Sequence, residues 1–123
     1  NATIGGSVTA TSYSGSASAM SGVQSAAYAV TTQSANYPVS DGDEVIIMNG
    51  SSLGLTLPTA ADNEGRVIHI VNENASALTL LVSGQTIIGN GTSTAVDRVV
   101  AARSNVSLLC SNNKFYIIAG AAT

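Results

Sequence analysis

The stretch that decides the fold is Leu53-Gly-Leu-Thr-Leu-Pro58, followed by Thr-Ala-Ala-Asp-Asn-Glu-Gly65 and Arg66-Val-Ile-His-Ile-Val-Asn72. Leu53, Leu55 and Leu57 fall on one side of an extended strand, because side chains alternate with a period of two. Pro58 lacks the N–H group that a strand interior needs, so the strand ends there. Residues 60–64 can form one tight or helical turn, and Gly65 can adopt the positive φ needed to leave it. A β-branched run follows, so the stretch predicts a strand, a corner and a second strand.

Short β-type runs separated by turn residues continue to the end of the chain. Asn49-Gly50 predicts a two-residue hairpin turn before the strand that begins at Leu53. Strands of about five residues recur roughly every eight to twelve positions, which is the spacing of an all-β sandwich or barrel. We therefore expect an all-β fold, a small antiparallel β-sandwich or compact barrel. The expected strands are residues 45–48, 53–57, 66–72, 78–82, 86–88, 94–100, 106–110 and 115–119.

Residues 1–36 carry no charge and consist mainly of Ser, Ala, Gly and Thr, so they cannot build a core of their own. A flexible linker is one interpretation. An extended arm that attaches the protein or contacts another subunit is the other, and residues 17–29 could also form a short helix. We favour the arm, with residues 37–123 as the β-sandwich domain. The arm is favoured by spaced apolar and aromatic residues, chiefly Tyr13, Met20, Val23 and Tyr28.

Charge is scarce in this chain. Charged residues make up 9% of the sequence, against about a quarter in an ordinary soluble domain. The net charge is −3, and the cations Arg66, Arg98, Arg103 and Lys114 are well separated, so we expect no nucleic-acid partner. The longest uncharged stretch, residues 1–40, is too rich in Ser, Thr and Gly to span a bilayer, and we expect no membrane partner.

The second face of several expected strands is also apolar. Leu81, Leu109, Tyr116 and Ile118 lie at positions where a free-standing sandwich usually has polar side chains that meet water. Few charges are present to discourage association. We therefore expect another chain to cover this face, and a closed homo-oligomer is the usual form of such association.

The chemistry-bearing residues are few. His69 is the only histidine and shares a strand face with Val67 and Val71, which favours a core or interface role over that of a catalytic base. Asp97 or Glu73 are the candidates that could orient it. Cys110, the single cysteine, alternates with Val106 and Leu108 and is expected to be a small buried apolar residue. No nucleophile-elbow, P-loop or zinc-protease motif is present, so we predict no enzyme and no catalytic residue.

The turn Asp41-Gly42-Asp43-Glu44 concentrates three carboxylates, which could bind a hard cation such as Ca²⁺. It lacks the remaining ligands of an EF-hand loop. We interpret it as a solvated acidic turn that protects a strand end, and we predict no metal and no cofactor for this chain.

Five stretches between residues 37 and 119 share a pattern of strand, Leu-Pro corner and Gly turn: Tyr37-Pro-Val-Ser-Asp-Gly-Asp-Glu-Val-Ile-Ile, Leu55-Thr-Leu-Pro58, Asn63-Glu-Gly65-Arg-Val-Ile-His-Ile, Ser83-Gly84-Gln-Thr-Ile-Ile-Gly89 and Asn113-Lys-Phe-Tyr-Ile-Ile. With these stretches, residues 37–119 resemble a β-rich module of tailed-bacteriophage virion proteins, namely the small domains of tail fibres, head fibres and capsid decoration proteins. The resemblance implies a non-enzymatic, trimeric β-structure whose N-terminal segment fixes it to the particle. A closing aromatic pair that often contains Trp in such fibres is Phe115-Tyr116 here.

The function expected from this reasoning is that of a structural protein on the virion surface. A capsid decoration protein or short head fibre would be a homotrimer bound through its N-terminal arm to the major capsid protein or another virion protein. The alternative is a tail-fibre module that binds host-surface glycan. Its expected contacts are Asn112, Asn113 and Tyr116, since glycan sites pair an exposed aromatic ring with amide side chains.

Overall fold

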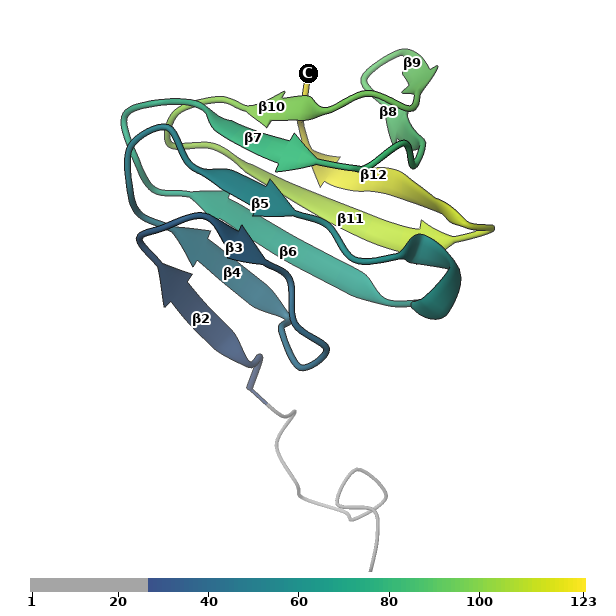
Figure 1. Cartoon of the computed structure of the whole chain (residues 1–123), viewed down its shortest axis with the longest axis horizontal. Coiled ribbons are helices and arrows are strands. Elements are labelled where there is room, and N and C mark those ends of the chain that lie inside the picture. The colour runs from purple at the N-terminus through teal and green to yellow at the C-terminus, as the bar shows by residue number, and fades with distance from the viewer. Residues whose placement is uncertain (1–26) are drawn as a thin grey trace, which may run out of the picture.

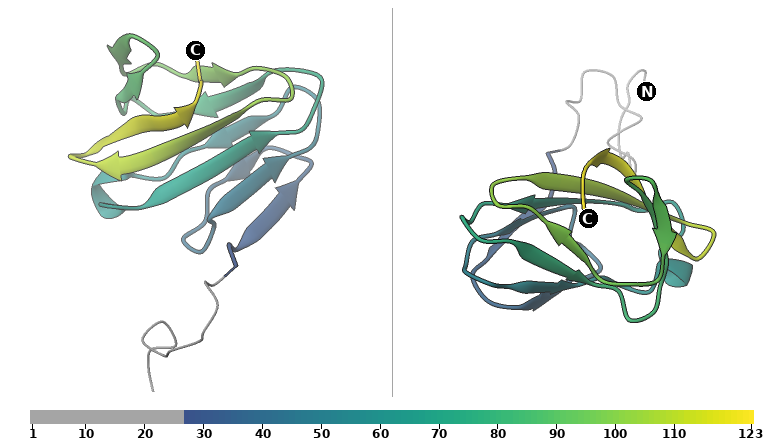
Figure 2. Two further views of the ribbon diagram at one scale, coloured as in Figure 1. Left: turned by 180° about the vertical axis from the view of Figure 1, so that it is seen from behind. Right: turned by 90° about the horizontal axis from the view of Figure 1, so that it is seen from above.

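The computed structural model describes residues 27–123, whose strands form two facing sheets (Figures 1 and 2). The only helical element among these residues is the short 3-10 helix η2 (Ala60–Asp62). The smaller sheet has the order β10 (Arg98–Val100), β7 (Leu78–Leu81), β5 (Gly54–Thr56), β3 (Tyr37–Pro38). The larger sheet has the order β2 (Val30–Gln33), β4 (Val45–Met48), β6 (Val67–Asn72), β11 (Asn105–Ser111), β12 (Lys114–Gly120), β8 (Ile87–Gly89), β9 (Thr92–Thr94).

From β2 to β7 the chain winds from one sheet to the other with every successive strand (Figure 1). Strands that are neighbours within a sheet therefore run in the same direction, and the pairs β2–β4, β4–β6, β3–β5 and β5–β7 are all parallel. Antiparallel pairs close the winding, with β10 beside β7 and β11 between β6 and β12. The expected all-β class is confirmed, but the antiparallel arrangement is wrong, because both sheets are mixed.

The hairpin expected at Asn49-Gly50 is also wrong, because this turn passes between the sheets. β4 pairs with strands of the larger sheet and β5 with strands of the smaller one. Ser52 adopts a positive φ of 55° in this connection. An added Cβ on Gly50 would lie 2.8 Å from the carbonyl oxygen of Ser34. Glycine therefore lets the β4–β5 connection pass close to the β2–β3 connection.

The corner after β5 forms as the sequence predicts. Residues 60–62 make the helical turn η2, and Gly65 leaves the corner with a φ of +82°. Gln85, from the distant loop before β8, binds the corner from both sides. Its Oε1 accepts a hydrogen bond from the Ala60 N–H at 2.6 Å, and its Nε2 donates to the Pro58 carbonyl at 2.9 Å. The corner is thereby fixed to the second half of the chain.

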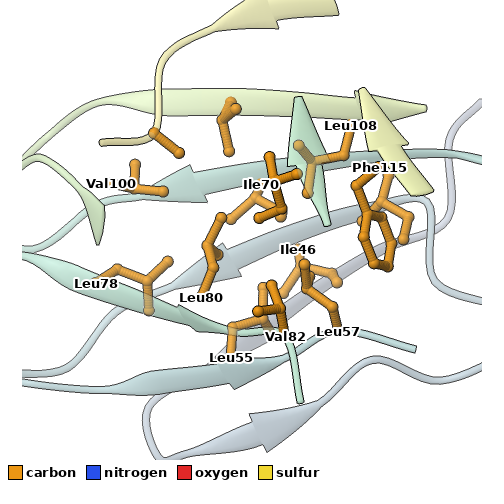
Figure 3. Packing of buried hydrophobic residues seen from close by; sticks show 14 of the residues in the cluster. Ile46, Leu55, Leu57, Ile70, Leu78, Leu80, Val82, Val100, Leu108 and Phe115 are labelled. Carbon is orange, nitrogen blue, oxygen red and sulfur yellow. The ribbon is translucent and has the colours of Figure 1, made fainter. Parts of the chain in front are cut away.

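The core lies between the two sheets and draws on nearly every strand (Figure 3). Burying these side chains supplies the main favourable term in folding. Leu55 and Leu57 are buried as expected, and Leu53 packs against the core from its edge. Cys110 is fully buried in the same cluster. The largest side chains that are fully enclosed include Phe115, Ile46, Met48, Leu55, Ile68, Ile70, Leu78, Leu80, Ile87 and Leu108.

Two parts of the chain depart from the expected boundaries. β2 pairs with β4, with Val30 opposite Val45, so the folded region includes residues before the expected boundary at Tyr37. Residues 27–29 are not helical. The single strand expected at residues 94–100 is two strands, β9 and β10, because a bend at residues 95–97 turns the chain from the larger sheet to the smaller one.

Three polar side chains are buried among the described residues, and two of them, Arg98 and Asn72, each bond several carbonyl oxygens. Arg98 is 3% exposed and donates to the carbonyl oxygens of Ile87 at 2.6 Å, Gly89 at 3.0 Å and Ala122 at 3.3 Å. Asn72 donates through Nδ2 to three carbonyl oxygens at 2.8 to 3.2 Å. Each therefore ties separate loops together, because a buried polar group is tolerated only when it is hydrogen-bonded.

Candidate functional site: the outer face of the larger sheet

The larger sheet presents an apolar surface on the side turned away from the core. In β4 and β6 every second residue points to this side and is half-buried, while its neighbours are buried. In β11 the same side carries Leu109 together with the polar residues Asn105, Ser107 and Ser111, and Ser107 is buried. In β12 a register shift interrupts the alternation, and Ile118 is exposed there. Cross-strand pairs connect them: Ile47 lies opposite Val71, and Val67 opposite Leu109. We call this surface the outer face and define it by Val45, Ile47, Val67, Val71, Leu109 and Ile118.

Two residues that the sequence singled out meet on the outer face. His69 lies between Val67 and Val71, as expected, and its Nδ1 is 2.8 Å from the Ser107 hydroxyl. The ring of Tyr28 contacts the His69 ring edge to face, with 5.2 Å between ring centroids. Tyr28 is 62% exposed. The other expected arm contacts, Tyr13, Met20 and Val23, lie outside the described residues.

Within residues 27–123, no carboxylate is hydrogen-bonded to the His69 ring of the His69–Ser107 pair. Ser107 is the only hydrogen-bond partner of the imidazole within residues 27–123. The acids considered as orienting groups lie elsewhere: Asp97 accepts from the Val82 N–H at 3.0 Å, and Glu73 follows the far end of β6. Ser107 is itself 6% exposed, so its hydroxyl offers little access to a substrate.

A shallow groove of about 740 Å³ crosses one end of the outer face. Its floor is Val67 and His69, and Tyr28 and Ile118 also line it. The acidic turn of residues 41–44 and Arg66 form its polar end. The groove therefore joins an apolar surface to the charged margin of the sheet.

The acidic turn uses its carboxylates internally. Asp43 accepts hydrogen bonds from the Tyr37 hydroxyl and the Ser40 N–H, both at 2.7 Å, and Glu44 accepts from the Ala29 N–H at 2.6 Å. Arg66 donates to the carbonyl oxygens of Ser40 and Asp43. In the described part of the chain, no three His, Cys, Asp or Glu side chains gather as a metal site. The turn acts as a hydrogen-bonded strand end.

The residues considered for glycan binding lie together at the tip of the β11–β12 hairpin. The Asn112 side-chain amide donates to the Tyr116 hydroxyl at 3.3 Å. Asn112 and Asn113 both have positive φ, 53° and 60°, and both are exposed in the turn. Glu64 braces the turn by accepting from the Asn112 N–H at 3.0 Å. The tip thus presents an aromatic ring, two amides and a carboxylate.

Cys110 lies in β11 of this hairpin, opposite Phe115 of β12, and its side chain is buried on the side that faces the core. Burial raises the pKa of its thiol, the Arg66 guanidinium opposes this shift and the Glu64 carboxylate adds to it. A raised pKa keeps the sulfur protonated at neutral pH, and only the thiolate is a nucleophile. Its position facing the core matches the role expected from the sequence.

Comparisons with protein families, curated proteins and solved structures gave no match to this chain. Within residues 27–123, no helix is long and apolar enough to span a membrane.

Proposed function

We propose that this protein is a structural, non-enzymatic component of the virion surface of a tailed bacteriophage. Within that class, a capsid decoration protein or short head fibre that assembles as a homotrimer fits best. The observation that carries the proposal is the outer face, an apolar and almost uncharged sheet surface of the kind that subunits bury against one another. The virion setting comes from the resemblance of residues 37–119 to modules of such particles.

The mechanism is assembly by burial. Each square ångström of apolar surface removed from water contributes about 25 cal/mol, partly offset by the cost of association. The segment that precedes the described residues would carry attachment to the capsid, through Tyr13, Met20 and Val23. The β-domain would project from the particle.

Removing residues 1–26 tests this division of labour. The truncation keeps every described strand, so we expect the oligomer to persist while cosedimentation with capsids of the source phage falls at least about tenfold, or about 1.4 kcal/mol in binding free energy. Light scattering and circular dichroism control for the mass and fold of the truncated chain. Capsid binding that equals that of the full chain would reject attachment through this segment.

A glycan-binding fibre module is the second candidate, and the Asn112–Tyr116 contact at an exposed hairpin tip favours it. Aromatic rings stack on sugar rings, and amides bond their hydroxyls. If this candidate is right, Tyr116→Ala should reduce adsorption to host cells at least about tenfold, a loss of about 1.4 kcal/mol. The oligomeric mass should not change, and Tyr37→Phe, at the acidic turn, serves as the control. Unchanged adsorption would reject the glycan role.

A further inference from the structure

We infer that the outer face of the larger sheet is the surface on which a second copy of this chain packs. The inference rests on the proposed function, which requires self-assembly, and identifies the surface responsible. The partner that covers the face is a second copy of the chain. The number of copies that pack together through this face sets the symmetry of the assembly.

The size of the outer face is suited to a subunit contact. Strands lie about 4.8 Å apart and rise about 3.3 Å per residue, so the six strands from β2 to β8 span roughly 25 Å across the sheet. The strands β6, β11 and β12 are about 20 Å long, and β2, β4 and β8 are shorter. The sheet therefore presents at most about 500 Å² in projection, and the relief of the side chains adds to it. Specific interfaces bury about 800 Å² per partner, whereas monomers rarely expose apolar patches beyond a few hundred Å².

The chemistry of the face selects its partner. His69 is the ionisable side chain at the middle of the face, where it is already bonded to Ser107, and Tyr116 lies toward the hairpin tip at the edge of the face. The charged residues lie at the margin, in residues 41–44, at Arg66 and at Lys114. A partner that brought charge to the centre would bury it unpaired, at a high cost. The same face of another copy brings none, and it has the apolar centre and polar rim typical of interfaces.

The smaller sheet provides an internal comparison, because it offers less continuous surface. Its four strands are two to four residues long, whereas β6, β11 and β12 are six or seven. Its outward positions include Pro38, Thr56 and Thr79, beside Leu81 and Val99. The larger, more continuous surface is therefore the one to which we assign the contact.

The groove on the outer face supplies a place for an anchoring side chain. It lies between Tyr28 and Ile118, which are 62% and 52% exposed, over a floor of Val67 and His69. Binding energy in interfaces concentrates where aromatic and apolar side chains enter such recesses. Tyr28 is held there by its contact with His69, so it loses little further freedom on association.

The experiment is light scattering and sedimentation of the full chain over a wide range of concentrations. The wild type should have a mass that is a multiple of the chain mass. Ile118→Lys and Val67→Lys should each weaken association at least about tenfold, because each places a cation in the apolar part of the groove that the second copy would cover. Val99→Lys is the matched control on the smaller sheet, and its mass should equal that of the wild type. Thermal unfolding checks that each variant is folded. Position 118 is half-exposed, so a lysine there can place its ammonium group in water and the monomer should tolerate it.

A wild-type chain that stays monomeric would overturn the inference, and so would an oligomer that both lysine variants leave intact. Capsid cosedimentation separates this from the proposed function. A monomeric chain that binds capsids would overturn the interface and retain the virion role. If the wild type is an oligomer that Ile118→Lys disperses, but the wild type does not bind capsids, the interface is supported and the virion role is overturned.

Discussion

Replacing Arg98 by Met should lower the free energy of unfolding by about 3 to 5 kcal/mol. The guanidinium donates to the carbonyl oxygens of Ile87, Gly89 and Ala122, and within residues 27–123 no carboxylate is among its hydrogen-bond partners. Met fills the space of the stem but removes the guanidinium donors of the buried Ile87 and Ala122 oxygens, whereas the Gly89 oxygen still accepts from the Thr92 hydroxyl. The loss should be visible in urea unfolding as a lower midpoint with an unchanged slope.

Two variants control for this effect. Arg98→Lys keeps the charge, but its single ammonium group lacks the planar fork of donors with which the guanidinium reaches several carbonyl groups. Its loss in free energy of unfolding should therefore be smaller than that of Arg98→Met but larger than zero. Arg103→Met removes an exposed arginine and should change stability by no more than about 0.5 kcal/mol. If Arg98→Met costs no more than Arg103→Met, Arg98 does not fix the C-terminal end of the fold.

Gly120→Ala should be the second severe substitution, with a cost of about 3 to 5 kcal/mol. Gly120 has a φ of +74°, which an alanine resists. An added Cβ would overlap the carbonyl oxygen of Asn105 and lie 2.9 Å from the Cα of Val106. Both obstacles are backbone atoms of β11, so no side-chain rotation can relieve the clash. Chemical unfolding followed by circular dichroism measures the loss.

Other glycines separate the two causes of this cost. Gly84 has a similar φ of +82° but open space around its Cβ position, so Gly84→Ala should cost only about 1 to 2 kcal/mol. Gly42 has open space and no positive φ, and Gly42→Ala should be within about 0.5 kcal/mol of the wild type. Equal costs for Gly120→Ala and Gly84→Ala would show that the close approach to Asn105 is unimportant.

The strands of this fold could be predicted from the sequence because their alternation is clear. The pattern of Val67, His69 and Val71 facing one way and Ile68, Ile70 facing the other is present in the letters and holds in β6. The corner at residues 58–65 was predicted in the same way, since Pro58 and Gly65 act through local backbone geometry.

The path between strands could not be predicted from the same local signals. Asn49-Gly50 is a strong hairpin dipeptide, yet the chain continues through Ser52 into the opposite sheet. Parallel pairs such as β4–β6 join segments far apart in sequence, and their pairing depends on how the two sheets pack. Side chains alternate in the same way in parallel and antiparallel strands, so the alternation does not indicate the relative direction of neighbouring strands.

The buried polar residues were missed, although one of them had a signal. Asn72 continues the inward series of Ile68 and Ile70, so alternation alone would place it in the core. Arg98 had no such signal. Val99 and Val100 are equally apolar, so alternation does not show which side of this strand faces the core. For the candidate site, the apolar second faces at Leu109, Tyr116 and Ile118 were visible in the sequence. The His69–Ser107 bond and the Tyr28 contact depend on strand register and could not be predicted.

If the chain belongs to a tailed phage as proposed, electron cryomicroscopy of the capsids of that phage, incubated with a saturating amount of the full chain, tests the proposed assembly role most directly. We expect density at symmetry-related positions on the capsid, with several copies at each and with their outer faces buried against one another. Empty capsid surfaces, or single copies whose outer face meets solvent, would contradict it.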